Sequence, residues 1–290
     1  MASLRSLLEG PTPRPLLLVG TPIAALVLIS VFVFLGFPYD AFAPSLGHRL
    51  SAASGADVRI GGIDPRLTIG GPGIAVRNVI VLTPEGQPIS IDPLRVRAAW
   101  STSWLSGQPA LHIDLVSEIG EAEGTLRFGE PMGWSGELQD LDLARLPFAL
   151  PSGMEISGRA DIDADLLMAD GTVTGDLVFA ALDGALSHPS LPIEIDFEQF
   201  GGEVVLGGEN LAEIQSIVLN GQTVQARASG TVAQSRRPGQ NPLNLIVDIE
   251  VKNPGMANLM RTMGVDLDPQ DRVSFRLGGS MQNPTVVPQR

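Results

Sequence analysis

The 290-residue sequence contains no cysteine. This absence excludes disulfide frameworks, thiolate nucleophiles, iron–sulfur clusters and zinc sites built on cysteine. Lysine occurs once, at Lys252, and 19 basic against 32 acidic residues give a formal net charge of −13. A nucleic-acid-binding protein needs a basic face to displace counterions from phosphates, so the charge balance argues against a nucleic-acid partner.

Residues suited to catalysis are also scarce. Of the three histidines, His112 shares a strand face with Asp114, but the sequence offers no third ligand or base nearby. No Gly-x-Ser-x-Gly elbow and no phosphate-binding glycine loop occurs. We therefore expect a protein that is not an enzyme, with no catalytic residue, no metal and no cofactor. A hydrolase with an unrecognised site is the weakest alternative.

Three carboxylates share one face of a predicted strand, at Asp161, Asp163 and Asp165. Such oxygens suit calcium, but an EF-hand loop needs glycine at its sixth position and glutamate at its twelfth. Leu166 and Thr172 occupy those positions here. We interpret the three aspartates as solvated residues of a strand.

One long apolar run, over residues 16–37, contains no charged side chain. As a helix its 22 residues would span about 33 Å, which matches a hydrocarbon core of about 30 Å. A cleaved signal peptide, with Ala41-Phe42-Ala43 as its small-residue site, is the alternative, but the run is longer than an ordinary signal core. The run predicts a single transmembrane helix, whose anchoring side chains are Leu16, Leu17, Leu18, Ile23, Leu26, Leu28, Ile29, Phe32, Phe34 and Phe37.

The charges that flank this run suggest an orientation. Arg5 and Arg14 precede it, and the positive-inside tendency then leaves residues 1–15 in the cytoplasm. The expected location is the bacterial inner membrane, crossed once. Residues 38–56 would form an amphipathic connector helix, and residues 57–290 a periplasmic β-domain.

From about Asp57 onward, apolar and polar residues alternate with a period of two, which is typical of half-buried strands. Pairs such as Asp170-Gly171, Asn220-Gly221 and Gly201-Gly202 read as turns between them. The spacing predicts a mostly β fold of a dozen or more antiparallel strands in an elongated, curved sheet, either an open groove or a flattened sandwich.

Two short helices are expected to cap this sheet. The connector would begin at Asp40 as N-cap and present an apolar side made of Phe42, Leu46, Leu50 and Ala53. Residues 255–264 carry a stripe that either closes the sheet or docks a partner, made of Met256, Leu259, Met260 and Met263.

Apolar strand residues on one concave face would need cover. At about 25 cal/mol per Å², leaving them in water costs many kcal/mol, so an open groove implies a lipid or a protein partner, whereas a sandwich would fill itself. The candidate apolar groove consists of Ile193, Ile195, Phe197, Leu206, Ile217, Leu219, Leu245, Val247 and Ile249.

Five segments follow the apolar run in a characteristic order: Phe37-Pro38-Tyr39-Asp40, Gly55-Ala56-Asp57-Val58-Arg59-Ile60, Pro72-Gly73-Ile74-Ala75-Val76-Arg77-Asn78-Val79, Ile91-Asp92-Pro93-Leu94-Arg95-Val96 and Ser103-Trp104-Leu105-Ser106-Gly107. This order resembles protein N of the bacterial type II secretion system and the broader AsmA-like group of inner-membrane-anchored periplasmic β-proteins. The resemblance implies a non-enzymatic accessory component of a type II secretion system, with the inner membrane and other secretion components as partners. The AsmA-like alternative implies a periplasmic protein that binds or transfers phospholipid.

Overall fold

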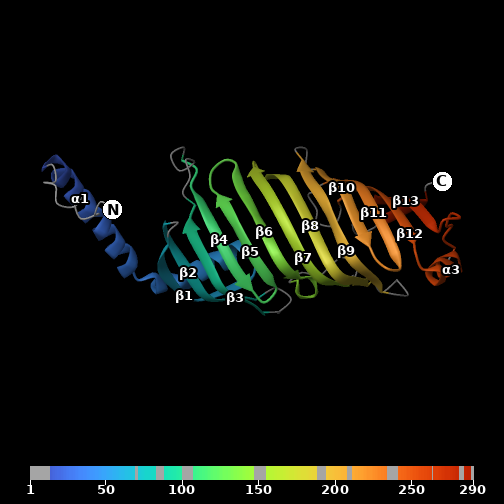
Figure 1. The fold of residues 1–290 in the computed structure, drawn as a ribbon, viewed down its shortest axis with the longest axis horizontal. Helices are drawn as coiled ribbons and strands as arrows, with labels where there is room; N and C mark the ends of the chain where they lie inside the picture. The colour runs from blue at the N-terminus through green and yellow to red at the C-terminus, as the bar shows by residue number, and fades with distance from the viewer. Residues whose placement is uncertain are drawn as a thin grey trace, which may run out of the picture.

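The computed structural model describes residues 14–68, 71–82, 88–99, 107–146, 155–187, 194–207, 211–233, 241–262, 264–280 and 284–288. Its strands form one 14-stranded sheet in which spatial order equals chain order and every neighbouring pair is antiparallel (Figure 1). The strands are β1 (Asp57–Thr68), β2 (Gly71–Leu82), β3 (Pro88–Ala98), β4 (Ala110–Ser117), β5 (Gly120–Arg127), β6 (Met132–Asp142), β7 (Glu155–Ala169), β8 (Thr172–Ser187), β9 (Ile195–Gly207), β10 (Leu211–Asn220), β11 (Val224–Ala233), β12 (Leu243–Val251), β13 (Arg272–Gly279) and β14 (Pro284–Pro288).

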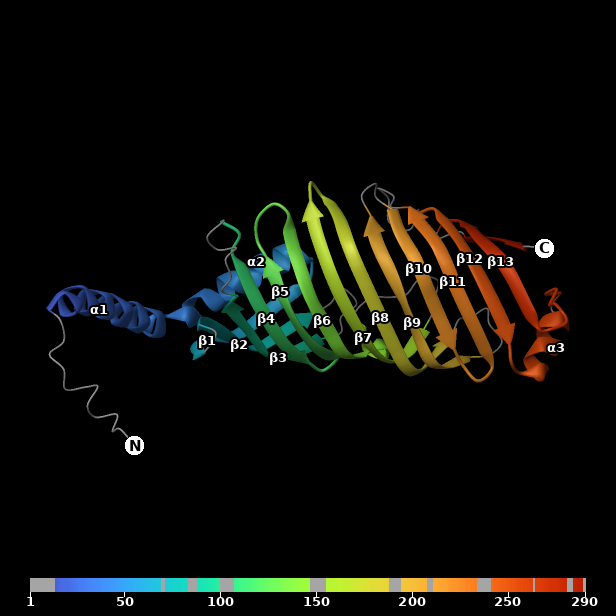
Figure 2. The ribbon, with the colours of Figure 1, turned by 45° about the horizontal axis from the view of Figure 1, so that its top comes forward.

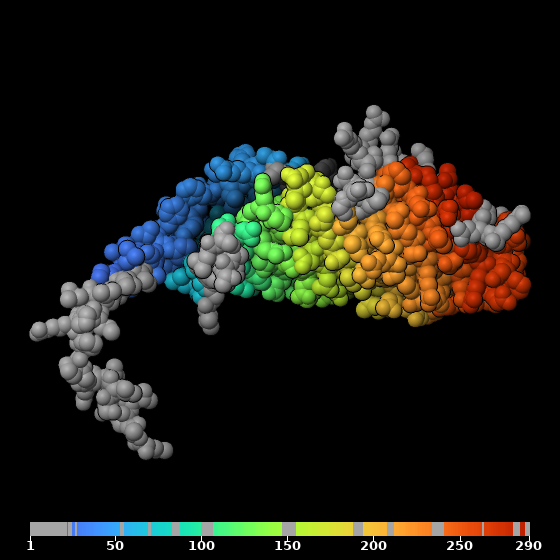
Figure 3. Space-filling view, turned by 90° about the horizontal axis from the view of Figure 1, so that it is seen from above, coloured from blue at the N-terminus to red at the C-terminus, as the bar shows by residue number. Residues whose placement is uncertain are grey.

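The sheet is long and open. In Figures 1 and 2 the strands cross the long axis of the molecule and follow one another along it in a single layer. Figure 3 shows the chain passing in order from one end of the molecule to the other. The 13 steps between the 14 strands, at about 4.8 Å each, extend over roughly 60 Å. The predicted antiparallel sheet is confirmed. The flattened sandwich is wrong, because the described strands all belong to one sheet.

The two glycine-containing pairs Asp170-Gly171 and Gly201-Gly202 have different roles in the sheet. Asp170 and Gly171, with φ of 51° and 75°, form the predicted tight turn between β7 and β8. The turn predicted at Gly201-Gly202 is wrong, because both residues lie inside β9. A Cβ on Gly202 would lie 2.5 Å from the carbonyl oxygen of Ser216, so glycine here allows β10 to approach closely beside its bulge.

Helix α1 (Arg14–Gly36) projects beyond β1 at one end of the sheet (Figure 2). Among the described residues, no single helix meets the length and hydropathy expected of a membrane span. Leu28–Gly36 and Tyr39–Ala52, bent by 54° at their break, meet those criteria together, by length and composition only. The predicted transmembrane helix over residues 16–37 therefore stays a prediction.

The predicted connector consists of a 3₁₀ turn, η2 (Tyr39–Phe42), and helix α2 (Ala43–Ser54). Its packing differs from the prediction: Ala43 and Gly47 are buried, whereas Phe42 and Leu50 are exposed. The reason is close approach, since a Cβ on Gly47 would lie 2.9 Å from the carbonyl oxygen of Val58 in β1. Leu46 packs as predicted, since it lies against the buried cluster that Ala43 and Val58 belong to.

Asp40 is not an N-cap. Neither η2 nor α2 has a side-chain cap, and Asp40 instead accepts a hydrogen bond at Oδ1 from the backbone N–H of Ile63, at 2.9 Å. The carboxylate thus joins η2 to β1. It satisfies a backbone donor of β1 two residues after Gly61.

Helix α3 (Pro254–Thr262) lies at the far end of the sheet and packs against β12 (Figure 1). Asn253 caps it, because its Oδ1 accepts from the N–H of Gly255 at 2.8 Å. Ala257 is fully buried, Met256 and Met260 are half-buried and Leu259 is exposed; Met263 lies outside the described residues. The methionine side of α3 is therefore only partly covered.

Candidate functional site

Strand register aligns one line of apolar residues across the whole sheet. Residues paired across antiparallel strands point to the same face, so a chain of such pairs defines a row on one face. One row contains a residue from each of the 14 strands and no polar one: Ile63, Val76, Leu94, Leu115, Ala122, Leu138, Ile162, Phe179, Gly202, Ile217, Ala228, Val247, Phe275 and Pro288. We call this line the apolar row and the side that carries it the apolar face.

The candidate groove residues lie on β9, β10 and β12. Ile217 and Val247 belong to the apolar row. Leu219, Leu245 and Ile249 are two positions away from them on the same strands and so share their face. Phe197 packs with Phe200 and Leu219, Ile195 is two residues before it, and Leu206 is four after Gly202; Ile193 lies outside the described residues.

Cover on the apolar face is uneven. At the first strands, Ala43, Tyr39 and Leu46 pack on Val58, Ile63, Val76 and Val79, which are all buried. A second buried cluster combines Ala160, Ala181 and Phe197 with neighbours that include Leu141 and Leu143. The helices pack mainly against β1, β7 and β12, and the described side chains of the apolar row from Leu138 to Phe275 stay half-buried.

Trp134 covers two glycines in the middle of the apolar face. A Cβ on Gly124 would lie 2.5 Å from Trp134 Cζ2, and one on Gly136 would lie 3.0 Å from the same atom. The indole therefore occupies the space above two glycines on β5 and β6. Sequence reasoning missed this arrangement, because it depends on the register between neighbouring strands.

The opposite face is polar and rich in carboxylates. One of its rows runs through Arg95, Asp114, Glu123, Glu137 and Asp163 on β3 to β7. Arg95 Nη1 lies 3.2 Å from Asp114 Oδ2. Both side chains of this ion pair are largely exposed to solvent, so the pair adds little stability.

The residues considered for metal binding lie on this polar face, and His112, Asp114, Asp161 and Asp165 have separate partners. His112 Nε2 lies 3.0 Å from Glu123 Oε1, whereas Asp114 pairs with Arg95. Asp161 Oδ1 accepts from the N–H of Asp140 at 2.9 Å, and Asp165 Oδ1 lies 3.6 Å from Arg127 Nη2. In the ranges that the structure describes, no group of three or more histidine, aspartate or glutamate side chains is arranged to hold a metal ion.

A cavity of about 1210 Å³ lies near the far end of the sheet. It is formed by β11, β12, β13 and the loop after α3, and its lining mixes Arg227, Asp248 and Arg272 with Ile249 and Val273. Sequence reasoning did not anticipate it, since the loop over residues 264–271 carries no recognisable motif.

Comparison of the chain with known protein families, with curated proteins and with solved structures finds no match. The resemblance to the type II secretion protein N and AsmA-like groups thus stays a prediction.

Proposed function

We propose that this protein binds the acyl chains of phospholipids on its apolar face while α1 tethers it to a membrane. The observation that carries the proposal is the apolar row, which crosses all 14 strands without a polar side chain. Hydrocarbon is the ligand chemistry that such a surface suits, because the side chains of the row offer neither hydrogen bonds nor charge.

Energetics support a ligand on this face. Fully burying one large apolar side chain is worth about 1.5–3 kcal/mol, and soluble monomers seldom expose continuous apolar patches beyond a few hundred Å². Contact with acyl chains would therefore bury more of the half-buried side chains in the apolar row between Leu138 and Phe275, and this burial lowers the free energy of the complex. One leaflet of a bilayer core is about 15 Å thick, so a face of roughly 60 Å has room for several lipids.

The tether is proposed on the character of α1. Its 23 residues would extend about 34 Å as a helix. The described side chains Leu26, Leu28, Ile29, Phe32 and Val33 are all exposed, with Phe32 at 72%. A helix that exposes such apolar side chains is stable in lipid, and Arg14 at its start favours a cytoplasmic N-terminus.

Paired aspartate substitutions on β12 test lipid binding. Val247 lies on the apolar row, and Ile246, its neighbour on the strand, lies on the opposite face and is 38% exposed. The full-length protein is purified in mild detergent and its lipids are measured by extraction and mass spectrometry. We expect phospholipid with the wild type and with I246D, and at least a tenfold loss with V247D, because a carboxylate in hydrocarbon costs about 2.5–3.5 kcal/mol.

A second pair, I217D with V218D as its control, repeats the comparison on β10. Circular dichroism verifies that each variant keeps its sheet. A wild-type protein without phospholipid would refute the proposal, as would folded V247D and I217D that carry wild-type amounts.

The second candidate is an accessory subunit of a type II secretion apparatus, which β14 favours. Among the described strands it pairs with β13 alone, and Val286 and Val287 are 59% and 57% exposed. Unpaired edge strands accept strands from partner proteins. Deletion of the gene should then impair secretion of exoproteins, and normal secretion in the deletion strain rules this candidate out.

A further inference from the structure

We infer that Trp134 selects ester-linked phospholipids: its indole N–H donates a hydrogen bond to an ester carbonyl oxygen of the bound lipid. This contact fixes the point on the apolar face at which the acyl chains begin. The inference rests on the proposed function and deepens it, because it assigns one polar subsite within a surface that otherwise binds hydrocarbon.

Two further rows of paired residues lie beside the apolar row on the same face. On β6 the three rows pass through Leu138, Gly136 and Trp134, which are two residues apart and so point to one side. The middle row consists of the residues that pair through Gly136 from β1 to β14. The outer row consists of those that pair through Trp134 from β3 to β12.

The indole N–H of Trp134 is the one hydrogen-bonding side-chain group in these three rows. Within the described residues it has no hydrogen-bond partner, and the tryptophan side chain is half-buried. In the same ranges, the fully buried polar side-chain atom without a partner is Thr223 Oγ1, so Nε1 of Trp134 remains accessible at the surface. A single accessible donor therefore lies in the middle of the apolar face.

This donor matters once hydrocarbon covers the face. In water the N–H is solvated, but acyl chains would displace the water around it. A donor that is buried without an acceptor costs more than the hydrogen bond itself contributes. A phospholipid carries acceptors directly beside its acyl chains, in its ester carbonyl groups, so the lipid that binds best places an ester at Trp134.

The surroundings of Trp134 set the direction of the acyl chains. On β6 (Met132–Asp142) the steps from 134 to 141, at about 3.3 Å each, extend over roughly 23 Å, whereas one leaflet of a bilayer core is about 15 Å thick. At the far end of this stretch, Leu141 packs on the buried cluster that contains Ala160 and Phe197. The ester groups thus lie near the start of β6, and the chain ends lie toward the buried cluster.

An ester lipid and an ether lipid with the same chains and headgroup test the contact. Full-length protein in mild detergent is incubated with equal amounts of a diester phosphatidylethanolamine and its dialkyl ether analogue, and the bound lipids are measured by extraction and mass spectrometry. We expect the wild type to enrich the ester about two- to tenfold, the contribution of one neutral hydrogen bond. W134F keeps an aromatic ring over Gly124 and Gly136 but lacks the N–H, so it should bind both lipids equally.

L166M is the matched control, because Leu166 neighbours Trp134 in the outer row and carries no donor. It should keep the wild-type preference. A wild type that does not enrich the ester would overturn the inference and leave the proposed function intact. A preference that survives in W134F, with its sheet verified by circular dichroism, would overturn it as well. Wild-type protein that takes up neither lipid would instead refute the proposed function.

The direction of the chains is tested without changing Trp134. The chain has no native cysteine, so L166C in the outer row and I162C in the apolar row, both on β7, can each carry an NBD fluorophore. The two positions are about 13 Å apart along the strand. Phosphatidylcholine with a doxyl group near the ester should quench position 166 more strongly, and a doxyl group near the chain end should quench position 162 more strongly. The same order of quenching with both lipids would overturn the inference.

Discussion

At the scale of single residues, the apolar face depends on where side chains are missing. Gly136 faces the backbone of β5: a Cβ there would lie 2.4 Å from the carbonyl oxygen of Glu123 and 2.5 Å from the Cα of Gly124. For a Cβ on Gly133, on the same strand, the three nearest atoms belong to the side chains of Arg127 and Leu167, the closest at 3.0 Å. Two glycines of β6 thus tolerate substitution very differently.

G136A should therefore destabilise the protein by about 1–3 kcal/mol, because backbone cannot yield as a side chain does. G133A, the matched control, should change the free energy of unfolding by less than about 0.5 kcal/mol, since the ends of two long side chains can move. Chemical denaturation followed by circular dichroism measures both. Equal losses in the two variants would show that the strands at Gly136 are not as close as described.

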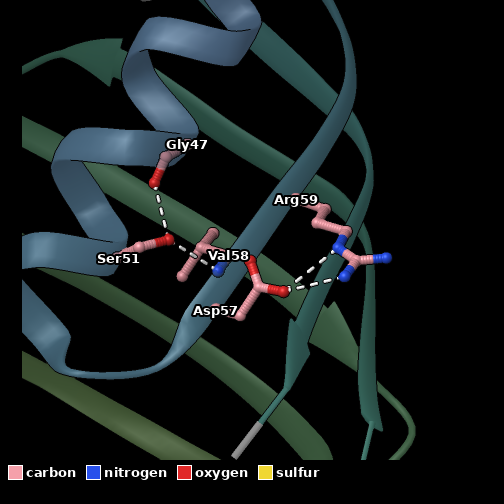
Figure 4. Close-up of polar contacts among 5 residues, drawn as sticks. All are labelled: Gly47, Ser51, Asp57, Val58 and Arg59. Carbon is pink, nitrogen blue, oxygen red and sulfur yellow. Dashed lines mark hydrogen bonds and ion pairs between the residues drawn. The ribbon is translucent and has the colours of Figure 1, made fainter.

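At the scale of elements, the joint between α2 and β1 holds the helical end of the molecule to the sheet. Ser51 contributes to it by accepting from the N–H of Val58, a buried residue (Figure 4). Removing the hydroxyl leaves that backbone donor without its partner. Such a loss costs more than the hydrogen bond itself contributes, because the donor stays buried away from water.

We expect S51A to lower stability by about 1–3 kcal/mol. Ser45, which is exposed on the same helix, supplies the control, and S45A should fall within about 0.5 kcal/mol of the wild type. Thermal unfolding of both variants provides the measurement. If S51A unfolds at the temperature of S45A, the hydrogen bond to Val58 is not what fixes α2.

At the scale of the whole molecule, the sheet resembles a one-dimensional array, because each strand pairs only with its neighbours in the chain. In such arrays stability is a sum of local terms, and the ends open more readily than the middle. The two ends differ here. β14 has five residues and an unpaired side, whereas β1 packs against α2 and η2.

Hydrogen exchange should reveal this gradient. We expect the amides of β14 to exchange fastest, those of β7 and β8, the two longest strands, to exchange slowest, and those of β1 to be protected by the cover of α2. Mass spectrometry after a deuterium pulse resolves the peptides concerned. Uniform protection from β1 to β14 would instead indicate one cooperative unit.

The faces of the strands and some of the turns can be predicted from the sequence. The alternation at residues 245–249 places Leu245, Val247 and Ile249 on one side of a strand, and Asp170-Gly171 marks a hairpin because both residues accept positive φ. Gly201-Gly202 was misleading, since glycine also occurs inside strands where a neighbouring backbone comes close. The packing side of α2 is predicted only in part: Leu46 packs on the sheet, but the closest approach is that of Gly47 to Val58.

The sequence by itself determined the strands, their two unlike faces and their antiparallel succession, because a period of two and short turns are local properties. Only the tertiary structure decided that the sheet stays single and open. A period of two is equally compatible with a second sheet on the apolar side and with leaving that side to another molecule. It also decided that Val247, Ala228 and Phe275 share one row, because register depends on how distant strands pair.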